Sequence, residues 1–232
     1  MDIELGKSDM KISIIVPVYN EAPTINKLID NLEQFKDCCE IIFVDGGSSD
    51  GTDRIIEKKY RPFYSPQKGR SCQMNYGASL SKGDILLFLH ADSFLPDDAL
   101  SQIHSIIHKG YKVGCFKIKF NSRNILMKVC GFMSNLRVRL RNIAFGDQGI
   151  FIDRNYFYEL GGFAETPLME DYQLSMDIKA NGEKIALTGT KIETSERRFV
   201  QKGRLRTMMR MQRLQYMYRK GKDIDMIANL YK

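Results

Sequence analysis

Short apolar runs alternate with amphipathic segments through the first half of this chain, and this alternation constrains the fold most. The runs are "ISIIVPV" (12–18), "CEIIFVD" (39–45) and "DILLFL" (84–89), and a helical periodicity of Ile and Leu over 21–35 follows the first of them. Near-continuous apolar strands separated by helices are typical of a mostly parallel sheet that helices cover on both faces. The sequence therefore predicts an α/β protein with a Rossmann-like sheet.

Length and composition set limits on the class of protein. A chain of 232 residues with 43% hydrophobic content can bury a real core as one domain. Its apolar runs are far shorter than the roughly 20 residues of a membrane span, and residues 1–10 lack a signal-peptide pattern. The five cysteines show no C-x-x-C spacing, which argues against a zinc site and a disulfide framework. We expect a cytoplasmic protein.

The positive charge is concentrated in the second half of the chain. The net charge is +7, and neither 117–146 nor 197–221 contains a single Asp or Glu. Such a half should face an anionic partner. A nucleic-acid-binding module is one candidate, but the chain has no recognition motif and carries acids where phosphates would have to approach. We therefore expect no nucleic acid among the partners.

Polar residues stand where the predicted strands end. Glu21 follows the first strand, Asp45 ends the second, and His90 and Asp92 follow the third. Ligands of parallel sheets bind at these carboxyl ends, and side-chain alternation predicts that His90 and Asp92 share one face. The alternative is that Asp92 only caps the next helix and that His90 is a core residue.

Six segments carry a resemblance to a known family. In chain order they are "ISIIVPVYNEAPTI", "IIFVDGGSSDGT", "GRSCQMNYGAS", "GDILLFLHADS", "LGGF" and "MEDYQLSMDIKANG". Together they resemble a family 2 glycosyltransferase with the GT-A fold, from about Lys11 to Ala186. The H-A-D at 90–92, in place of the usual D-x-D, is similar to a small bacterial subgroup known as "transferase 2, rSAM/selenodomain-associated".

The resemblance implies a nucleotide site on the first half. Pro17 and Tyr19 would line the base with Glu21 nearby, and Asp45 would accept a hydrogen bond from uracil. A carboxylate suits an imide N–H in this role. Arg70 would grip the diphosphate, since a guanidinium can hold phosphate oxygens in a bidentate fork. The alternative for Arg70 is a solvated loop charge.

The resemblance also implies a divalent cation, Mn²⁺ or Mg²⁺, that bridges the diphosphate. Such hard cations prefer oxygen ligands, and one or two protein carboxylates with phosphate oxygens suffice. Asp92 is the expected metal ligand. His90 stands in place of the first acid, and it either contacts ribose or diphosphate or assists Mn²⁺.

Glu170 and Asp171 are the expected catalytic residues. Helical spacing of the apolar residues after them places both near the start of a helix, where acids are also favoured for purely structural reasons. The resemblance implies that Asp171 is the base and Glu170 its orienting partner. Asp171 would remove the proton of an acceptor hydroxyl while the hydroxyl oxygen attacks the anomeric carbon and displaces the nucleoside diphosphate. This displacement would invert the configuration at the anomeric carbon.

The expected function is therefore transfer of a sugar from a nucleoside-diphosphate sugar, most simply a UDP-sugar, to a hydroxyl acceptor. Two alternatives remain open. One is a catalytically impaired relative that only binds nucleotide. The other is a nucleotidyltransferase, which would want a glycine-rich loop after the first strand, where this chain has "PVYNEAPT".

Two segments of the second half have open interpretations. The resemblance implies that Asp147 and Gln148 face the acceptor, and a local turn is the alternative. The segment 124–142 has an apolar helical stripe, for which we expect core packing, with a membrane-binding face as the alternative. The members of this stripe are Leu126, Val129, Cys130, Met133, Leu136 and Leu140.

Three interpretations compete for the basic segment 197–221. Arg206, Arg210 and Arg213 share one helical face, which can lie on an anionic membrane near a lipid-linked acceptor. Arg198 or Arg204 can instead close over the diphosphate, or the helix can simply be solvated.

The predicted division of the single domain follows these motifs. A nucleotide-sugar half covers about 11–115, an acceptor and catalytic half about 116–196, and a basic helical extension about 197–232. Peripheral association with the inner face of the cell membrane is compatible with this division.

Overall fold

The structure is a computed structural model that describes residues 10–231, with only the backbone of Arg198. Its sheet has eight strands in the order β3-β2-β1-β4-β7-β6-β8-β5. The strands are β1 (Ile12–Val18), β2 (Glu40–Asp45), β3 (Pro62–Tyr64), β4 (Ile85–Phe88), β5 (Ser93–Phe94), β6 (Val113–Phe120), β7 (Ile150–Asp153) and β8 (Ile185–Thr194).

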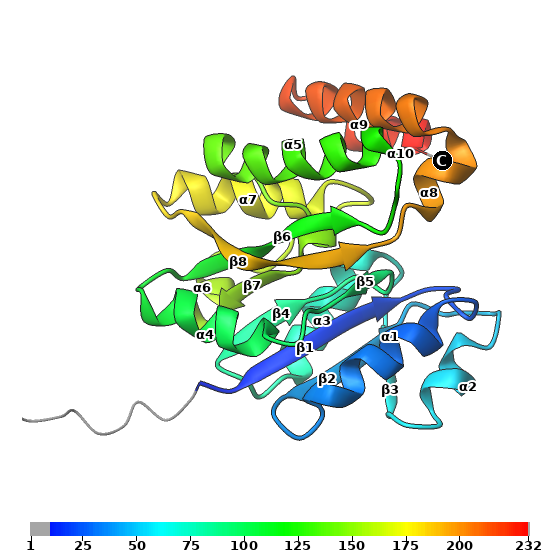
Figure 1. The fold of residues 1–232 in the computed structure, drawn as a ribbon, viewed down its shortest axis with the longest axis vertical. Helices are drawn as coiled ribbons and strands as arrows, with labels where there is room; N and C mark the ends of the chain where they lie inside the picture. The colour runs from blue at the N-terminus through cyan, green and yellow to red at the C-terminus, as the bar shows by residue number, and fades with distance from the viewer. Residues whose placement is uncertain (1–9, 232) are drawn as a thin grey trace, which may run out of the picture.

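Helices connect and cover these strands (Figure 1). They are α1 (Ile25–Leu32), α2 (Thr52–Ile56), α3 (Arg70–Leu80), α4 (Ala99–His108), α5 (Ile125–Arg141), α6 (Arg154–Glu159), α7 (Glu170–Ala180), α8 (Arg197–Lys202), α9 (Arg204–Arg219) and α10 (Ile224–Tyr231). Short 3₁₀ helices occupy Glu33–Phe35 and Gly146–Gln148.

The predicted α/β fold with a mostly parallel sheet is confirmed. Strands β3, β2, β1 and β4 run parallel to one another, and β6 runs parallel to β8. The pairs β4·β7, β6·β7 and β5·β8 are antiparallel. The carboxyl ends of β1, β2 and β4 therefore meet at one edge of the sheet, where the sequence places its polar residues.

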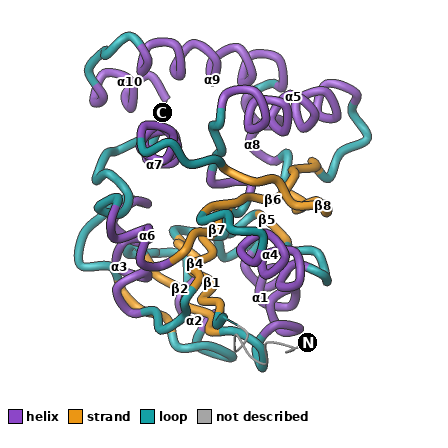
Figure 2. The backbone as a smooth tube through the Cα atoms, turned by 90° about the vertical axis from the view of Figure 1, so that its left-hand side faces the viewer, coloured by secondary structure: helices purple, strands orange, loops and turns teal. Residues whose placement is uncertain are grey.

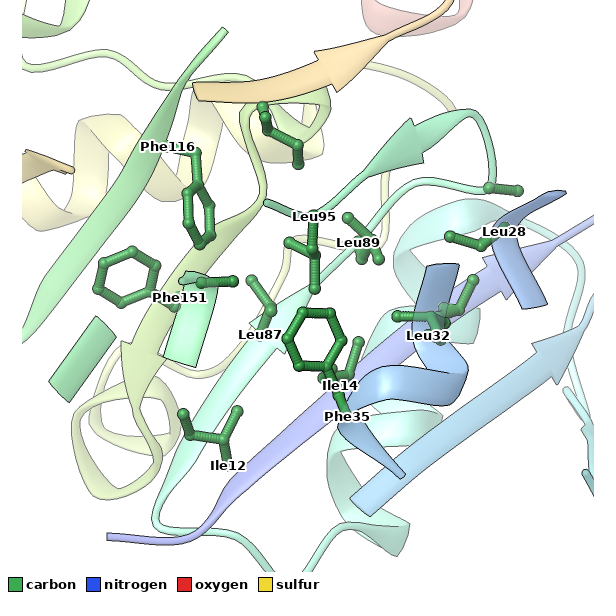
Figure 3. Packing of buried hydrophobic residues seen from close by; sticks show 14 of the residues in the cluster. Ile12, Ile14, Leu28, Leu32, Phe35, Leu87, Leu89, Leu95, Phe116 and Phe151 are labelled. Carbon is green, nitrogen blue, oxygen red and sulfur yellow. The ribbon is translucent and has the colours of Figure 1, made fainter. Parts of the chain in front are cut away.

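Two apolar clusters hold helices on opposite faces of the sheet. On one face α1 and α4 pack on β1 and β4, and Figure 3 shows Leu28, Leu32 and Phe35 among these strands. On the other face α3, α6 and α7 pack against the same strands and against β6 and β7. The predicted helical periodicity over 21–35 is confirmed in detail, because the apolar residues of α1 are all buried.

A third cluster joins the C-terminal helices to α7. Leu214 of α9 and Ile227 of α10 are buried with Met169 and Tyr172, which flank the start of α7. Figures 1 and 2 both show α9 and α10 stacked beyond α7, on the side away from α1. The basic C-terminal segment thus packs directly beside the predicted catalytic residues. None of the helices in residues 10–231 combines the length and apolar character needed to cross a bilayer.

The expectation of core packing for the apolar stripe of α5 is wrong. Met127, Gly131 and Val138 form the buried side of this helix, whereas Met133 and Leu140 of the predicted stripe are 53% and 75% exposed. The helix is rotated so that its small and aliphatic residues at 127, 131 and 138 face the sheet. Close approach explains this choice, since a Cβ at Gly131 would meet the Ile118 carbonyl oxygen at 3.3 Å.

The geometry predicted for the end of the third strand also needs correction. Strand β4 ends at Phe88, and Ala91 and Asp92 lie in a turn before the short strand β5. His90 and Asp92 therefore do not share a face through strand alternation. The turn itself brings the segment to the sheet edge, where the Asp92 carbonyl accepts a hydrogen bond from Ser195 N at 3.1 Å.

Candidate active site

Asp45 closes β2 with a buried carboxylate, 1% exposed. Its Oδ1 atom accepts hydrogen bonds from the backbone N–H groups of Gly47 and Ser48, both at 2.7 Å. Its Oδ2 atom is buried and has no hydrogen-bond partner among the described residues. An unpaired buried carboxylate oxygen is costly, and a donor on a bound ligand would satisfy it.

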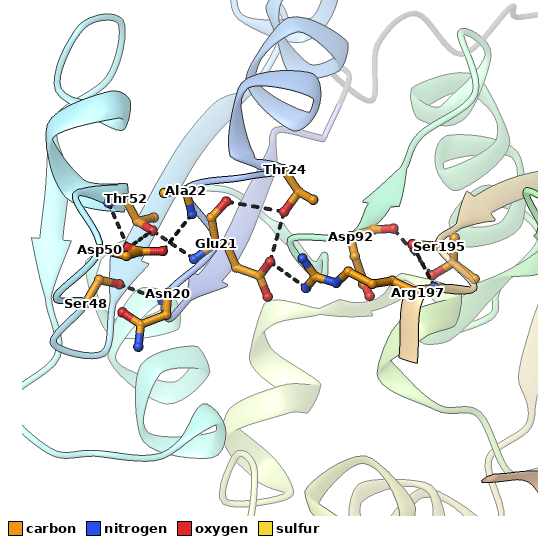
Figure 4. Close-up of polar contacts among 11 residues, drawn as sticks. Asn20, Glu21, Ala22, Thr24, Ser48, Asp50, Thr52, Asp92, Ser195 and Arg197 are labelled. Carbon is orange, nitrogen blue, oxygen red and sulfur yellow. Dashed lines mark hydrogen bonds and ion pairs between the residues drawn. The ribbon is translucent and has the colours of Figure 1, made fainter. Parts of the chain in front are cut away.

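The loops after β1 and β2 are joined by hydrogen bonds between side chains and backbone (Figure 4). Asn20, with a positive φ of 54°, receives the N–H of Ser49 on its side-chain oxygen at 2.9 Å. Asp50 accepts from Ala22 N at 3.0 Å. Pro17 is buried in β1, and Tyr19 beside it is 56% exposed, so an open aromatic ring borders this double loop.

Gln73 fixes the spacing of these two strand ends, and sequence reasoning missed it. Its buried Nε2 donates to the carbonyl oxygens of Val18 and Val44, both at 2.8 Å. A Cβ at Gly46 would lie 3.0 Å from the Gln73 amide, so only glycine fits comfortably there. A single glutamine within a helical segment gives no signal from which this role can be predicted.

Asp92 lies half-buried beside an ion pair that joins the two halves of the chain. Glu21 Oε2 lies 2.9 Å from Arg197 Nη2 and also accepts from the Thr24 hydroxyl at 2.9 Å (Figure 4). Burial, and then the nearby charge of Glu21, raise the pKa of the Asp92 carboxyl. A carboxylate with a raised pKa gains when a cation approaches it.

Arg197 is thus the arginine that the C-terminal segment brings to this edge. Of the two arginines expected there, Arg204 instead binds Glu196, with 2.9 Å from Nε to Oε2. That contact holds the junction of α8 and α9, so it does not support a diphosphate role for Arg204. The side chain of Arg198 lies outside the described residues. The absence of acids after 197 marked the basic segment but did not single out Arg197.

His90 is half-buried against the 3₁₀ helix that starts at Gly146. A Cβ at Gly146 would clash with the His90 imidazole, so any larger residue would displace this ring. The backbone N–H of the same Gly146 donates to Asp171 Oδ2 at 2.8 Å. Gly146 therefore lies against both the His90 imidazole and the Asp171 carboxylate.

Asp171 and Glu170 open α7, as the helical spacing predicts. Met169 precedes them with a positive φ of 68°, a strained conformation for methionine. Asp171 Oδ1 accepts from Tyr172 N at 2.7 Å, and burial raises the pKa of the Asp171 carboxyl against these N–H contacts. A carboxylate has about four lone-pair sites, so Asp171 can still accept a proton from a ligand.

Glu170 is 4% exposed and faces Arg70, with 3.5 Å between Oε1 and Nη1. Burial, and then the neighbouring Asp171, raise the pKa of Glu170, which Arg70 opposes. The Arg70 side chain is 44% exposed and yet pairs with this buried acid, so it is not an isolated loop charge. Its guanidinium stands at the start of α3 and lies within electrostatic reach of Asp92 as well as Asp171.

Asp147 completes a cluster of acids around Asp171. Burial raises the pKa of its carboxyl to about 6, Asp171 and Asp92 act in the same direction, and Arg137 opposes them. This result supports a place for Asp147 at the site rather than a mere turn role. Asp92 and Asp171 therefore both lie within electrostatic reach of Asp147.

Gln148 does not face the acceptor. It is fully buried, and its Oε1 accepts from Arg137 Nη2 at 2.8 Å. The guanidinium of Arg137 in turn stacks on Phe145 at 3.8 Å and donates to the Ile143 carbonyl. Gln148 and Arg137 thus support the turn that carries Gly146 and Asp147, and the prediction for Gln148 is wrong.

The donor set fits a divalent cation only with help from a ligand. No group of three or more His, Cys, Asp or Glu side chains in the described part of the chain could hold a metal ion. A cation that bridges a diphosphate needs one or two protein carboxylates, however. Asp92, with Glu21 nearby, offers hard oxygen atoms of that kind.

Solved structures with the same arrangement define the fold class. Residues 1–349 of Staphylococcus aureus TarS superpose with a TM-score of 0.65 at 20% identity, over 81% of this chain and 61% of that one. The mannosyltransferase PcManGT from Pyrobaculum calidifontis, in complex with GDP-Man and Mn²⁺, gives 0.65 at 19% identity, over 81% and 57%. The predicted GT-A fold of glycosyltransferases is confirmed.

The sequence adds the family. The model of glycosyl transferase family 2 matches residues 13–160, which is more than half of the chain, and the chain belongs to that family. An "Uncharacterized glycosyltransferase" of Rickettsia felis is 29% identical over 183 residues, covering 70% of this chain and 30% of the relative. An undecaprenyl-phosphate 4-deoxy-4-formamido-L-arabinose transferase of Pseudomonas fluorescens is 29% identical over 114 residues, covering 44% and 34%. The chain thus spans about a third of the length of these relatives.

Proposed function

We propose that this site transfers a sugar from a nucleoside-diphosphate sugar, with a UDP-sugar as the first choice, to an acceptor oxygen by inverting displacement. One observation carries the proposal. The sheet edge brings three carboxylates to one side of the molecule: the half-buried one of Asp92, the N–H-bound one of Asp171, and that of Asp45, whose Oδ2 has no hydrogen-bond partner within residues 10–231. Asp45 would serve the uracil base, Asp92 the cation on the diphosphate, and Asp171 the acceptor hydroxyl.

The uracil would bind at the double loop after β1 and β2. Its imide N–H is a donor that Asp45 Oδ2 lacks, and the exposed ring of Tyr19 offers a stacking surface beside the buried Pro17. Structures of S. aureus TarS in complex with UDP and with UDP-GlcNAc support a uridine donor for a chain of this fold.

The diphosphate would lie between Asp92 and the two arginines that reach this edge. Asp92 would hold Mn²⁺ or Mg²⁺ together with phosphate oxygens, and such a cation neutralises charge on the departing diphosphate when it is bound. Arg70 and Arg197 already lie close enough to Asp92 to lower its pKa, so they add positive charge there. His90, which lies against Gly146, would contact ribose or phosphate.

Asp171 would accept the proton of the attacking acceptor. Burial raises the pKa of Asp171 toward neutral pH, and a carboxylate with a higher pKa is a stronger base than an exposed aspartate. The N–H of Gly146 orients one oxygen, and the Glu170–Arg70 pair fixes the start of the helix that carries Asp171. Direct displacement needs no covalent intermediate, so positioning would supply much of the acceleration.

The acceptor would approach from the side of Asp147 and α7. The undecaprenyl-phosphate transferase among the relatives supports an acceptor carried on a lipid. Membership of the subgroup with H-A-D in place of D-x-D, and a location at the cytoplasmic face of the cell membrane, stay predictions from the sequence.

Calorimetric titration with UDP and GDP, with and without Mn²⁺, tests the donor site. We expect Mn²⁺-dependent UDP binding that Asp92→Ala abolishes and Asp45→Asn weakens. Asp37 is exposed and lies just before the start of β2, at the opposite end of this strand from Asp45. Asp37→Ala is therefore the matched control, and it should bind UDP like the unaltered chain. Absence of nucleotide binding, or equal binding by Asp92→Ala, would contradict the proposal.

A further inference from the structure

Helix α5 presents an apolar stripe to solvent. Ile125, Val129, Phe132 and Leu140 are 74%, 48%, 66% and 75% exposed, and their spacing puts them on one side of the helix. Large side chains at such exposure over a whole helix are unusual for a surface that only meets water. The opposite side of the helix, at Met127 and Val138, already packs on the sheet.

Helix α9 continues the same kind of surface. Leu205, Met209 and Tyr216 are 57%, 59% and 56% exposed. Figures 1 and 2 both show α9 beside α5 at the end of the molecule farthest from α2, and the two helices contact each other. We call the exposed sides of α5 and α9 the basic-apolar face.

Positive charge surrounds these apolar side chains without acidic neighbours in the chain. Exposed cations on α5 and just before it are Arg123, Lys128, Arg139 and Arg141, and on α9 they are Arg206, Arg213 and Arg219. Neither 117–146 nor 197–221 contains Asp or Glu. A surface of this composition complements an anionic layer that also accepts apolar side chains.

A groove along α5 adds a place for single anionic head groups. Its volume is about 620 Å³, and Phe132 and Leu136 line it together with several cations. These cations are Lys117, Lys119, Lys128, Arg139 and Lys191. Lys119 already pairs with Glu193 at 2.9 Å, and Lys117 donates to the Gly189 carbonyl, whereas Lys128 and Arg139 are exposed on α5.

We infer that the basic-apolar face docks this protein on a bilayer of anionic phospholipid, with Phe132 and Leu140 entering the head-group layer. Docking would bring the catalytic edge close to the membrane. The chain passes from the end of α5 into the 3₁₀ helix of Gly146, and α9 packs on the start of α7 through Leu214. The delivery of a lipid-linked acceptor rests on the proposed function, but the docking itself does not.

Flotation with vesicles tests the docking. The probes are vesicles of phosphatidylcholine alone and vesicles of phosphatidylcholine with phosphatidylglycerol. We expect binding to the anionic vesicles only, with an affinity that falls as salt rises because exposed charges are screened. Absence of binding to anionic vesicles at low salt would overturn the inference.

Paired variants separate the apolar from the electrostatic part. Phe132→Asp with Leu140→Asp should reduce binding on the order of tenfold or more, since two apolar insertions are lost. Arg206→Glu with Arg213→Glu should reduce it to a similar extent. Tyr111→Asp, at a 40% exposed position before β6, is the matched control for the first pair.

Three results would contradict this inference. They are undiminished binding by the Phe132 and Leu140 variant, an equal loss in the Tyr111 control, or a concentration-dependent dimer in sedimentation that the Phe132 and Leu140 variant abolishes. The last result would identify a second copy of the chain as the occupant of the face. Far-UV circular dichroism and a thermal melt of each variant check that it is folded. Vesicle binding requires no nucleotide, so the docking test stays apart from the proposed function.

Discussion

Helices α1 and α5 carry the same kind of sequence pattern and have opposite fates. In α1 the apolar residues at helical spacing, including Ile25 and Leu28, are fully buried against β1 and β4. In α5 the apolar stripe at Val129 and Leu140 faces solvent, and the small residue Gly131 faces the sheet. The comparison teaches that periodicity defines a face of a helix but not what covers it.

The two halves of the site differ in a parallel way. The first half holds its groups through loop hydrogen bonds, as Asp45 does with Gly47 and Ser48. The second half gathers acids whose burial raises their pKa values, namely Asp147, Glu170 and Asp171. Loops held in place by hydrogen bonds suit recognition of a nucleotide. Acids with raised pKa values suit proton transfer.

The largest effect should separate these two halves. Asp171→Asn should lower turnover about 10²- to 10⁴-fold, the usual contribution of a general base, while UDP binding is retained. Asp45→Asn should instead weaken UDP binding, because it replaces the carboxylate that would accept the hydrogen bond from the uracil imide. Transfer from a labelled UDP-sugar and calorimetry on both variants measure the two effects, and loss of UDP binding in Asp171→Asn would break the division.

The second prediction sharpens the comparison of α1 with α5. Leu28→Ala should lower the free energy of unfolding by about 2 to 5 kcal/mol, because it leaves a cavity in a packed cluster. Phe132→Ala should change it by less than about 0.5 kcal/mol, because the ring is mostly exposed. Urea denaturation of both variants measures the difference. A large loss with Phe132→Ala would mean that another copy or segment covers the ring.

Much of the first half could be predicted from the sequence, because its strands are buried on both faces and their polar ends stand out. Asp45 and Asp92 follow from such patterns, whereas the start of α7 at Glu170, in the second half, follows from helical spacing. Gln73, Arg197 and Gly146 could not be predicted, since their roles arise from contacts between segments far apart in the chain. The orientation of α5 depends on the space above the sheet, which the sequence does not display.

The third prediction concerns pH. The pKa of Asp147 in the folded chain is about 6, above its usual 3.8, so the folded state binds the proton more tightly than the unfolded state. Stability from this group is complete below about pH 4 and is lost as the pH rises through 6. Asp147→Asn should therefore raise the free energy of unfolding at pH 7 to 8 by up to about 3 kcal/mol and change it little near pH 4.

Urea denaturation at several pH values measures this effect. Asp37→Asn, at an exposed position, is the control that should show no such pH dependence. A variant Asp147→Asn that is less stable at pH 7 would contradict the assignment of Asp147 to a buried acid cluster.

The smallest effect is expected where the two halves touch. Arg197→Ala removes the 2.9 Å ion pair with Glu21, whose partners are partly exposed, so the loss of stability should be about 0.5 kcal/mol. The free energy of UDP binding should weaken by more than the free energy of unfolding, because Arg197 adds positive charge beside Asp92. Lys36→Ala, which removes the 3.9 Å pair of the exposed Lys36 with Glu33, is the control for surface charge. Equal UDP affinity in both variants would show that Arg197 has no role at the donor site.

A structure of the protein bound to UDP and Mn²⁺ tests the central claim most directly. The account predicts that the uracil imide donates to Asp45 Oδ2, that the cation joins Asp92 to the diphosphate, and that Asp171 remains open to the acceptor side. A nucleotide bound elsewhere, such as in the cationic groove along α5, would contradict it.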